Sequence, residues 1–430
     1  MNRFPFITIF NQKRLRFYTL RQNINMKLLL TFAVVLTSAI SFGQVSTCDG
    51  VRYTSFSYTP SLSTGIQFGN ATTIGNSNQN LFMDIYEPGG DVALDRPLII
   101  VAFGGSFIQG TRQDMDWMCE YYSSLGYVAA TIDYRLYDGP LFPVPDSVIM
   151  TEEVIMAVSD MKAAIRFFKE DAATFNNYRI DTNNIFVGGI SAGGIVASHV
   201  AMMDSADAIE SYIQPLLANN GGWTGNSSTN TQYTDNVRGL LNFSGALRKA
   251  SYIDSNDPDM FSVHDDGDPT VPYAFGAASI FGIPIISMEG SFLMDQQAQG
   301  VSVPSELITF PGNGHVSYFL DTPAMTDSVM WESASFLYDI ICPQFVDISE
   351  YELLDDALIY PNPTTNDLIV SWGEGNLTSI EVLNSLGQLI ETIICEGNEY
   401  TIDVSAYDTG AYLIRLNGLS GVKIKSIYKL

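Results

Sequence analysis

A serine framed by glycines is the first feature of this sequence that could carry chemistry. Ser191 lies in the run Gly189-Ile-Ser-Ala-Gly193, between the apolar segment Ile185–Gly188 and the helix-compatible stretch Ile195–Met203. A strand, Gly-x-Ser-x-Gly and a helix form a sharp turn that raises a serine hydroxyl above a sheet. The flanking residues must be small because neighbouring backbone passes close to the serine. The pattern predicts a nucleophilic Ser191, with the backbone N–H of Ala192 directed at a developing oxyanion.

A serine hydroxyl needs a base to take its proton, and the sequence offers three histidines. His199 lies inside the helix that follows Ser191, so it faces away from the turn and is expected to pack or lie at the surface. His264 and His315 each follow a strand-like segment. Because the chain order in this kind of site is serine, acid, histidine, His315 is the predicted base.

The acid that orients the base must lie between Ser191 and His315. Asp268 is our preferred candidate, because it occupies a turn beyond a strand end and two prolines stiffen its loop. Asp265 and Asp266 remain the alternatives.

A glycine-containing loop is expected to complete the oxyanion site. The run Phe103-Gly-Gly-Ser-Phe107 directly follows the apolar segment Pro97–Ala102. Gly104 and Gly105 allow the backbone N–H groups to approach a substrate oxygen closely. A second oxyanion donor is expected from the loop after the third strand of such a sheet.

Strand-like and helix-like patterns alternate between the first and third cysteines, which predicts a mostly parallel sheet flanked by helices. Leu81–Tyr86 alternates as an antiparallel strand does, whereas Tyr127–Ile132 is continuously apolar, as expected of a strand buried on both faces. Apolar residues at steps of three and four predict an amphipathic helix over Glu152–Ala172.

These features together resemble the α/β-hydrolase carboxylesterase and lipase family with an HGG-type oxyanion loop. The resemblance is carried by the loop and serine runs above, by Asp133-Tyr-Arg-Leu136, and by the acid and base candidates. It implies hydrolysis of carboxylic esters through an acyl-enzyme, with no cofactor. Its roles fall on Ser191 as nucleophile, His315 as base, Asp268 as orienter, and the backbone N–H groups of Gly105, Ser106 and Ala192 as oxyanion donors. Phe103 stands where the family has a histidine, and the loss of that side chain's hydrogen bonds is expected to loosen the loop.

The sequence indicates the type of reaction more clearly than it indicates the substrate. Short-chain esters, or acetyl and feruloyl esters on polysaccharides, are the expected substrates. The polar stretch Asn219–Gln232 is expected to form a lid or pocket wall, and the aromatic candidates for the pocket are Trp117, Trp223, Phe107 and Tyr318. A serine peptidase, a polyester depolymerase and a non-catalytic binding protein of the same fold are the alternatives.

Composition excludes several classes of protein. The 430 residues are 46% hydrophobic, which supports a large core, and the net charge of -26 opposes nucleic-acid binding. Cys48, Cys119, Cys342 and Cys395 show no metal-ligand spacing, so no metal site is expected. Up to two disulfides are possible in an oxidising compartment, and a Cys48–Cys342 bond would join the two ends of the larger region, but the sequence leaves the pairing open.

The beginning of the chain indicates export. A basic residue, an apolar stretch and small residues before Gln44 identify residues 26–43 as a signal peptide, and residues 1–25 are interpreted as an upstream extension. Since this apolar stretch is removed, no stable membrane insertion of the mature protein is expected. The α/β domain is assigned to residues 44–345.

The end of the chain has a different pattern. An acidic linker, 346–357, leads to short strand-like runs separated by turns over 358–430, which predict a small β-sandwich. This region resembles the C-terminal sorting domain of the type IX secretion system, through Tyr360-Pro-Asn-Pro363, Asn384-Ser-Leu-Gly-Gln388, Gly410-Ala-Tyr412 and Lys423-Ile-Lys425. The resemblance implies a partnership with the type IX machinery and a secreted or cell-surface location. A sugar-binding sandwich is the alternative.

Overall fold

The computed structural model describes residue 48 and residues 50–343, 357–372, 377–385, 387–395, 397–418 and 421–430. The predicted upstream extension and signal peptide lie outside these residues, as does the acidic linker except for its last residue. Within the described residues, no helix is both long and apolar enough to cross a membrane.

The larger domain is built on an eight-stranded sheet of order β1-β2-β4-β3-β5-β6-β8-β11. Strand β2 runs antiparallel to both of its neighbours, and the strands from β4 to β11 are parallel. The predicted mostly parallel sheet is therefore confirmed. The strands are β1 (Thr59–Thr72), β2 (Asn78–Gly89), β3 (Arg96–Ala102), β4 (Val128–Ile132), β5 (Ile180–Ile190), β6 (Gly239–Phe243), β8 (Asp259–Asp265) and β11 (Ser305–Phe310).

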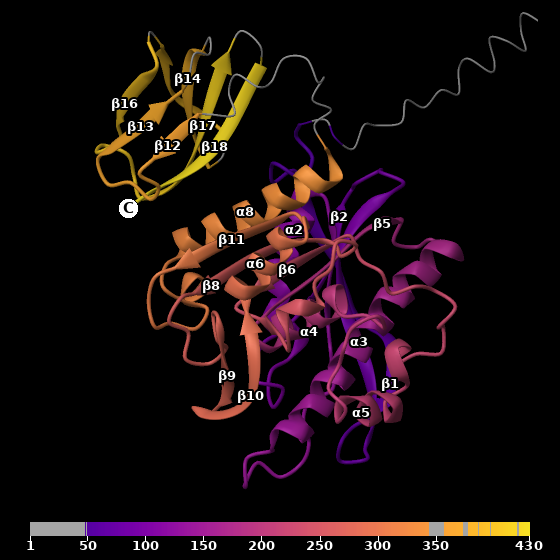
Figure 1. The fold of residues 1–430 in the computed structure, drawn as a ribbon. Helices are drawn as coiled ribbons and strands as arrows, with labels where there is room; N and C mark the ends of the chain where they lie inside the picture. Colours follow the sequence, from indigo (N-terminus) through magenta and orange to yellow (C-terminus); the bar gives the residue numbers. More distant parts are fainter. Residues whose placement is uncertain are drawn as a thin grey trace, which may run out of the picture. The chain divides into compact units, whose positions relative to one another are not determined.

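Helices cover both faces of this sheet, which explains why all residues of β3 and β4 are buried. In Figure 1, α2 (Asp116–Leu125) and α8 (Pro323–Ile341) lie on one side, and α3 (Ser147–Ala173) and α4 (Ala192–Met202) on the other. A hydrogen bond of 2.7 Å between the hydroxyls of Tyr122 and Ser333 joins α2 to α8. Three shorter helices complete the domain: α5 (Ile213–Asn219), α6 (Ser291–Gly300) and α7 (Ser317–Leu320).

Helix α3 begins five residues before the predicted start at Glu152. The Asp146 side chain accepts hydrogen bonds from the backbone N–H groups of Val148 and Ile149 and so caps the helix. The apolar periodicity does not mark this first turn, because Val148 is exposed there.

A β-hairpin belongs to a second, three-stranded sheet, and the sequence patterns did not predict it. Strands β9 (Phe275–Ile280) and β10 (Ile283–Gly290) are joined by a two-residue turn, and β10 also pairs with the short β7 (Ala246–Leu247). The turn residues Phe281 and Gly282 have φ values of 51° and 76°, which a tight hairpin of right-handed twist requires.

The C-terminal domain is all β, as predicted. Two antiparallel sheets, β12-β13-β16 and β15-β14-β17-β18, enclose a separate apolar core. The strands are β12 (Leu358–Tyr360), β13 (Asp367–Ser371), β14 (Leu377–Asn384), β15 (Leu389–Ile394), β16 (Glu399–Asp403), β17 (Gly410–Gly418) and β18 (Gly421–Lys429).

A disulfide between Cys48 and Cys342 resolves the pairing that the sequence left open. The two cysteines are 294 residues apart, so the bond closes a loop around the larger domain. Cys119 and Cys395 are free thiols.

Replacing both Cys48 and Cys342 by serine is expected to lower the free energy of unfolding by about 2 to 4 kcal/mol, because the bond restricts the unfolded chain. Urea unfolding of the two forms measures the difference. A Cys395→Ser variant is the control and should unfold at the wild-type urea concentration. Equal midpoints for all three proteins would show that the disulfide does not stabilise the fold.

Candidate active site

Ser191 occupies a strained turn between β5 and α4. Its backbone has φ 57° and ψ -116°, a region that non-glycine residues rarely occupy. The backbone is tightly packed here, and the chain can take this path because the residues beside Ser191 are small. A Cβ on Gly193, for example, would lie 2.0 Å from the carbonyl oxygen of Ala102. The backbone N–H of Ser191 donates to the carbonyl of Phe243 at 2.8 Å, which ties the turn to β6. The sequence therefore places the hydroxyl at the carboxyl end of a central strand.

The structure brings the three predicted side chains together in one hydrogen-bonded chain. The Nε2 atom of His315 lies 2.8 Å from Ser191 Oγ, and its Nδ1 atom lies 2.6 Å from Asp268 Oδ2. Ser191 follows β5, Asp268 follows β8 and His315 follows β11. The carboxyl ends of these three strands lie at one edge of the parallel sheet. Residues 124 positions apart in sequence meet for this reason.

The Asp268 carboxylate has no exposed surface. Burial alone would raise its pKa, but hydrogen bonds from His264 and His315 outweigh that cost and bring the pKa to about 2. Its Oδ1 atom also accepts from the backbone N–H groups of Thr270 and Val271, at 2.7 and 3.1 Å. Asp268 is consequently ionised near neutral pH and can only accept hydrogen bonds.

The charge on Asp268 sets the tautomer of His315. Because the carboxylate can only accept, the proton of the neutral imidazole lies on Nδ1, which donates to Asp268. The Nε2 atom is left as an acceptor for the hydroxyl proton of Ser191. This is the arrangement in which an imidazole removes a proton from a serine.

His264 is a second histidine at Asp268, and sequence reasoning did not place it there. Its Nε2 atom lies 3.1 Å from the carbonyl of Val271 and 3.4 Å from Asp268 Oδ2, and its Nδ1 atom lies 2.7 Å from Ser291 Oγ. Since the carbonyl can only accept, Nε2 carries the proton and Ser291 donates to Nδ1. The spacing of four residues along the end of β8 was the available signal, but the turn between the two residues had to be known.

The two alternative acids do not reach His315. Instead they hold the loop that carries it: Asp266 Oδ1 accepts from the backbone N–H of Gly312 at 2.9 Å, and Asp265 Oδ2 accepts from that of Ser317 at 3.0 Å. Of the three carboxylates, Asp268 is the one that contacts His315, and Asp265 and Asp266 contact backbone N–H groups of its loop.

The Phe103–Phe107 loop approaches Ser191 from β3. Gly105, Ser106 and Phe107 have φ values of 126°, 56° and 63°, so three consecutive residues adopt left-handed conformations. A side chain at Gly105 would meet the carbonyl of Gln109, because a Cβ there would lie 2.0 Å from that oxygen. Gly104 also packs against the turn, since a Cβ on it would lie 3.3 Å from Ser191 Cβ.

The backbone N–H groups of Gly105, Ser106 and Ala192 are available to a ligand. Among the described residues, none of the three has a hydrogen bond to a protein acceptor. Ala192 is the first residue of α4, where backbone N–H groups have no partner within the helix. Ser106 and Ala192 both line a cavity beside Ser191.

Phe103 anchors the loop by packing instead of by the side-chain hydrogen bonds of a histidine. The ring is buried and stacks on Tyr134 with a centroid separation of 4.3 Å. The hydroxyl of Tyr134 donates to the carbonyl of Phe103 at 2.9 Å. The loosening expected from the missing histidine is thus opposed by an aromatic stack and one buried hydrogen bond.

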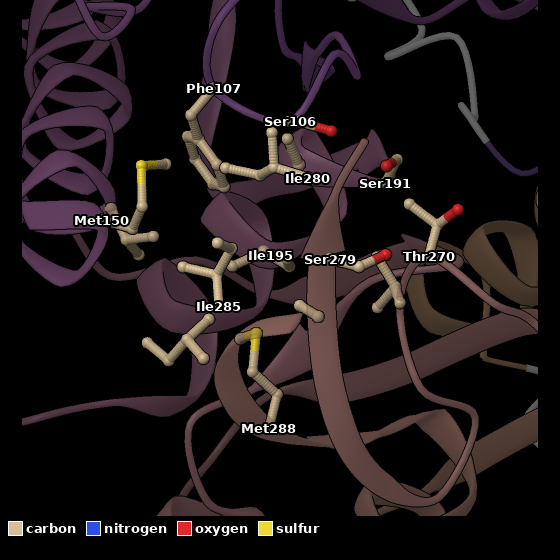
Figure 2. Close-up of a pocket in the computed structure, with 15 residues that line it drawn as sticks. Ser106, Phe107, Met150, Ser191, Ile195, Thr270, Ser279, Ile280, Ile285 and Met288 are labelled. Atoms are coloured by element: carbon tan, nitrogen blue, oxygen red, sulfur yellow. The ribbon is translucent and has the colours of Figure 1, made fainter. Parts of the chain in front are cut away.

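A small cavity of about 40 Å³ opens beside Ser191 (Figure 2). Its walls come from the Phe103–Phe107 loop, α3, α4, the Asp268 loop and the β9–β10 hairpin. The lining residues are Ser106, Phe107, Met150, Val154, Ser191, Ala192, Ile195, Thr270, Val271, Ala278, Ser279, Ile280, Ile285, Ile286 and Met288.

Of the four aromatic candidates for the pocket, Phe107 alone lines it. Tyr318 is buried and hydrogen-bonded to Ser244 Oγ at 2.9 Å, and Trp117 contacts Phe319. Trp223 lies in the stretch that was expected to form a lid, and it lines a different cavity, beside His199. That expectation was wrong because the hairpin, which the sequence patterns missed, supplies the wall.

The stretch Asn219–Gln232 is instead tied to α3. Ser227 Oγ bonds with Ser159 Oγ at 2.8 Å and donates to Asp160 Oδ1 at 2.5 Å. His199 packs in α4, as expected: its Nδ1 atom lies 2.8 Å from the carbonyl of Ile195, and burial lowers its pKa to about 4.

Two family models match the chain. Residues 83–223 match the BD-FAE family, and residues 358–429 match the secretion system C-terminal sorting domain. The chain is an esterase-like α/β-hydrolase that ends in a type IX secretion sorting domain. The sorting domain directs export by the type IX system, so this hydrolase is secreted or carried to the cell surface.

Solved structures with a similar chain path include esterases. Esterase 2 of the Planctomycetes species Thermogutta terrifontis with propionate bound is 21% identical, with a TM-score of 0.47 over 66% of this chain and 94% of that chain. Its butyrate-bound form is 20% identical, with a TM-score of 0.47 over 66% and 95%. A truncated carbohydrate esterase from gut microbiota is 18% identical, with a TM-score of 0.47 over 66% and 97%.

Replacing Asp268 by asparagine is expected to destabilise the hydrolase in a pH-dependent way. A lowered pKa means that folding favours the charged form, so the stabilisation is complete above pH ~4 and is lost as the pH falls toward the folded-state value of about 2. The difference in unfolding free energy between wild type and Asp268→Asn should therefore shrink by about 2 kcal/mol between pH 5 and pH 2. Urea unfolding of both proteins across this pH range measures the change. If the difference in unfolding free energy does not depend on pH, the pKa of Asp268 is not lowered by folding.

Proposed function

We propose that this protein is a secreted serine carboxylic-ester hydrolase that acts through Ser191, His315 and Asp268. The hydrogen-bonded chain from Ser191 Oγ through the His315 ring to a buried carboxylate is the observation that carries the proposal. The unpaired N–H groups at the Phe103–Phe107 loop and at Ala192 support it, because a tetrahedral intermediate needs donors for its oxyanion.

The first half of the reaction forms an acyl-enzyme. Ser191 Oγ attacks the ester carbonyl carbon while its proton passes to His315 Nε2, and the carbonyl oxygen becomes an oxyanion. The N–H groups of Gly105, Ser106 and Ala192 are the proposed donors to that oxyanion. Asp268 stabilises the imidazolium without taking its proton. The intermediate collapses, the bond to the alcohol oxygen breaks, and His315 gives that oxygen the proton.

The second half releases the acid. Water attacks the acyl carbon on Ser191 and gives a proton to His315 Nε2, and the same N–H groups hold the second oxyanion. Cleavage of the acyl bond then returns the proton from His315 to Ser191 Oγ. No cofactor enters either half of this scheme.

In this proposal residues 44–345 carry the hydrolase activity, 346–357 connect the domains, and 358–430 serve export. Short-chain esters and polysaccharide-linked acetyl or feruloyl esters are the substrates expected from sequence. Peptide or polyester cleavage would use the same side chains, but no feature of the described residues favours either one.

A Ser191→Ala variant of the exported protein tests the function. On p-nitrophenyl esters we expect kcat/KM to fall about 10⁴-fold or more, because no other group replaces the nucleophile. Ser61→Ala, which changes an exposed serine on β1, is the matched control and should retain wild-type activity.

Equal hydrolysis by Ser191→Ala and wild type would refute the assignment of the nucleophile. A folded wild-type protein that hydrolyses none of the esters would count against ester hydrolysis itself. Circular dichroism and the urea midpoint establish that each protein is folded.

A further inference from the structure

The cavity beside Ser191 has a polar end and an apolar end. Figure 2 shows the hydroxyl groups of Ser106 and Thr270 on the same side as that of Ser191. On the opposite side, Met150 of α3 and Ile285 of β10 present only carbon and sulfur atoms. An acyl group attached to Ser191 and directed into this cavity therefore extends from polar surroundings into apolar ones.

The β9–β10 hairpin is the main wall of the apolar part. It contributes six of the lining residues, and the only hydroxyl among them is already engaged, because Ser279 Oγ donates to the carbonyl of Pro269 at 3.0 Å. None of the described lining residues carries a charge. The six residues are Ala278, Ser279, Ile280, Ile285, Ile286 and Met288.

Hydrogen bonds connect the hairpin to the loop that carries Asp268. The backbone N–H of Ser279 donates to the carbonyl of Thr270 at 2.8 Å, and the N–H of Thr270 donates to Asp268 Oδ1 at 2.7 Å. The turn that orients the proposed base and the wall of the cavity are therefore joined by two consecutive hydrogen bonds. The wall of the cavity is thus connected through Thr270 to the carboxylate that contacts His315.

These features discriminate among acyl groups. An acetyl group has one methyl carbon and leaves the far end of the cavity unfilled. A hydroxylated aromatic acid would place a phenol beside Met150 and Ile285, and these side chains do not replace the hydrogen bonds that its hydroxyl makes with water. A saturated chain meets neither difficulty, because each added methylene removes apolar surface from water.

We infer that the cavity binds the acyl part of the ester and selects saturated aliphatic chains longer than acetyl, with the β9–β10 hairpin as the specificity-determining element. The inference rests on the proposed function, since it takes Ser191 as the nucleophile. It refines the substrates expected from sequence, because acetyl and feruloyl esters become the poorer ones.

A chain-length series tests the inference on the exported protein. With p-nitrophenyl acetate, butanoate, hexanoate, octanoate and decanoate, kcat/KM should rise about three- to fourfold per methylene from acetate until the cavity is filled, and then fall. Methyl ferulate should be hydrolysed more slowly than methyl hexanoate. A maximum at acetate, or a preference for methyl ferulate, would overturn the inference.

Variants at Ile285 locate the specificity in the hairpin. Ile285 is only partly buried, so its replacement leaves most of the core untouched. Ile285→Trp should reduce the ratio of kcat/KM for octanoate to that for acetate by at least tenfold, because the larger ring fills the far end. Ile285→Ala should move the optimum to a longer chain.

Ile283→Trp is the matched control. This residue lies two positions earlier on β10, is 46% exposed and does not line the cavity. Its octanoate-to-acetate ratio should equal that of wild type. If the Ile283 and Ile285 variants behave alike, the hairpin does not set the specificity.

Binding separates this inference from the proposed function. Calorimetry with Ser191→Ala should detect octanoate binding more tightly than acetate, and Ile285→Trp in that background should weaken octanoate binding. Such binding without ester hydrolysis by wild type would refute the proposed function and keep the aliphatic cavity. Hydrolysis lost in Ser191→Ala, but with no chain-length preference in either assay, would keep the function and refute the inference.

Discussion

The buried charge of Asp268 is the constraint on which the rest of the site depends. A carboxylate without exposed surface is unfavourable unless it is fully hydrogen-bonded. Here two backbone N–H groups and two imidazoles supply the partners: Thr270, Val271 and His264 are neighbours of Asp268 in sequence, and His315 comes from another loop. The His315 loop, the loop after β8 and the end of β8 itself must therefore close around one group. Satisfying this charge also sets the tautomer of His315 and the direction of proton transfer from Ser191.

The sheet makes this convergence possible. Parallel strands β5, β8 and β11 end at one edge, so the turns that follow them meet there. At the same edge the loop after β3 passes Ser191 in left-handed conformations, and the stack of Phe103 on Tyr134 holds it in place. Asp266 and Asp265 hold the loop of the base by accepting hydrogen bonds from the backbone N–H groups of Gly312 and Ser317. Each side chain of the site is thus positioned by a strand end and by a local hydrogen bond.

Local sequence patterns could predict those parts of the site whose geometry depends on residues adjacent in sequence. The run around Ser191 could be interpreted because a strand, a tight turn and a helix are adjacent in sequence. Chain order favoured His315 as the base, and the proline-containing turn favoured Asp268, with Asp265 and Asp266 left as alternatives. Pairings between distant segments were not accessible. The contact of His264 with Asp268 depends on the path of a turn, and the hairpin wall depends on β10 pairing with β7 across the domain. The turn at Phe281 and Gly282, with positive φ at both residues, gave only a weak signal, since phenylalanine is unusual in such a turn.

The central claim is that His315, held by Asp268, makes Ser191 nucleophilic. Covalent labelling of the intact protein by an alkyl fluorophosphonate tests this directly, because the reagent reacts with an activated serine and needs no knowledge of the substrate. Mass spectrometry should show a single adduct on the peptide that contains Ser191, and His315→Ala should slow its formation at least about 10³-fold. An adduct at another residue, or equal labelling rates in wild type and His315→Ala, would contradict the account.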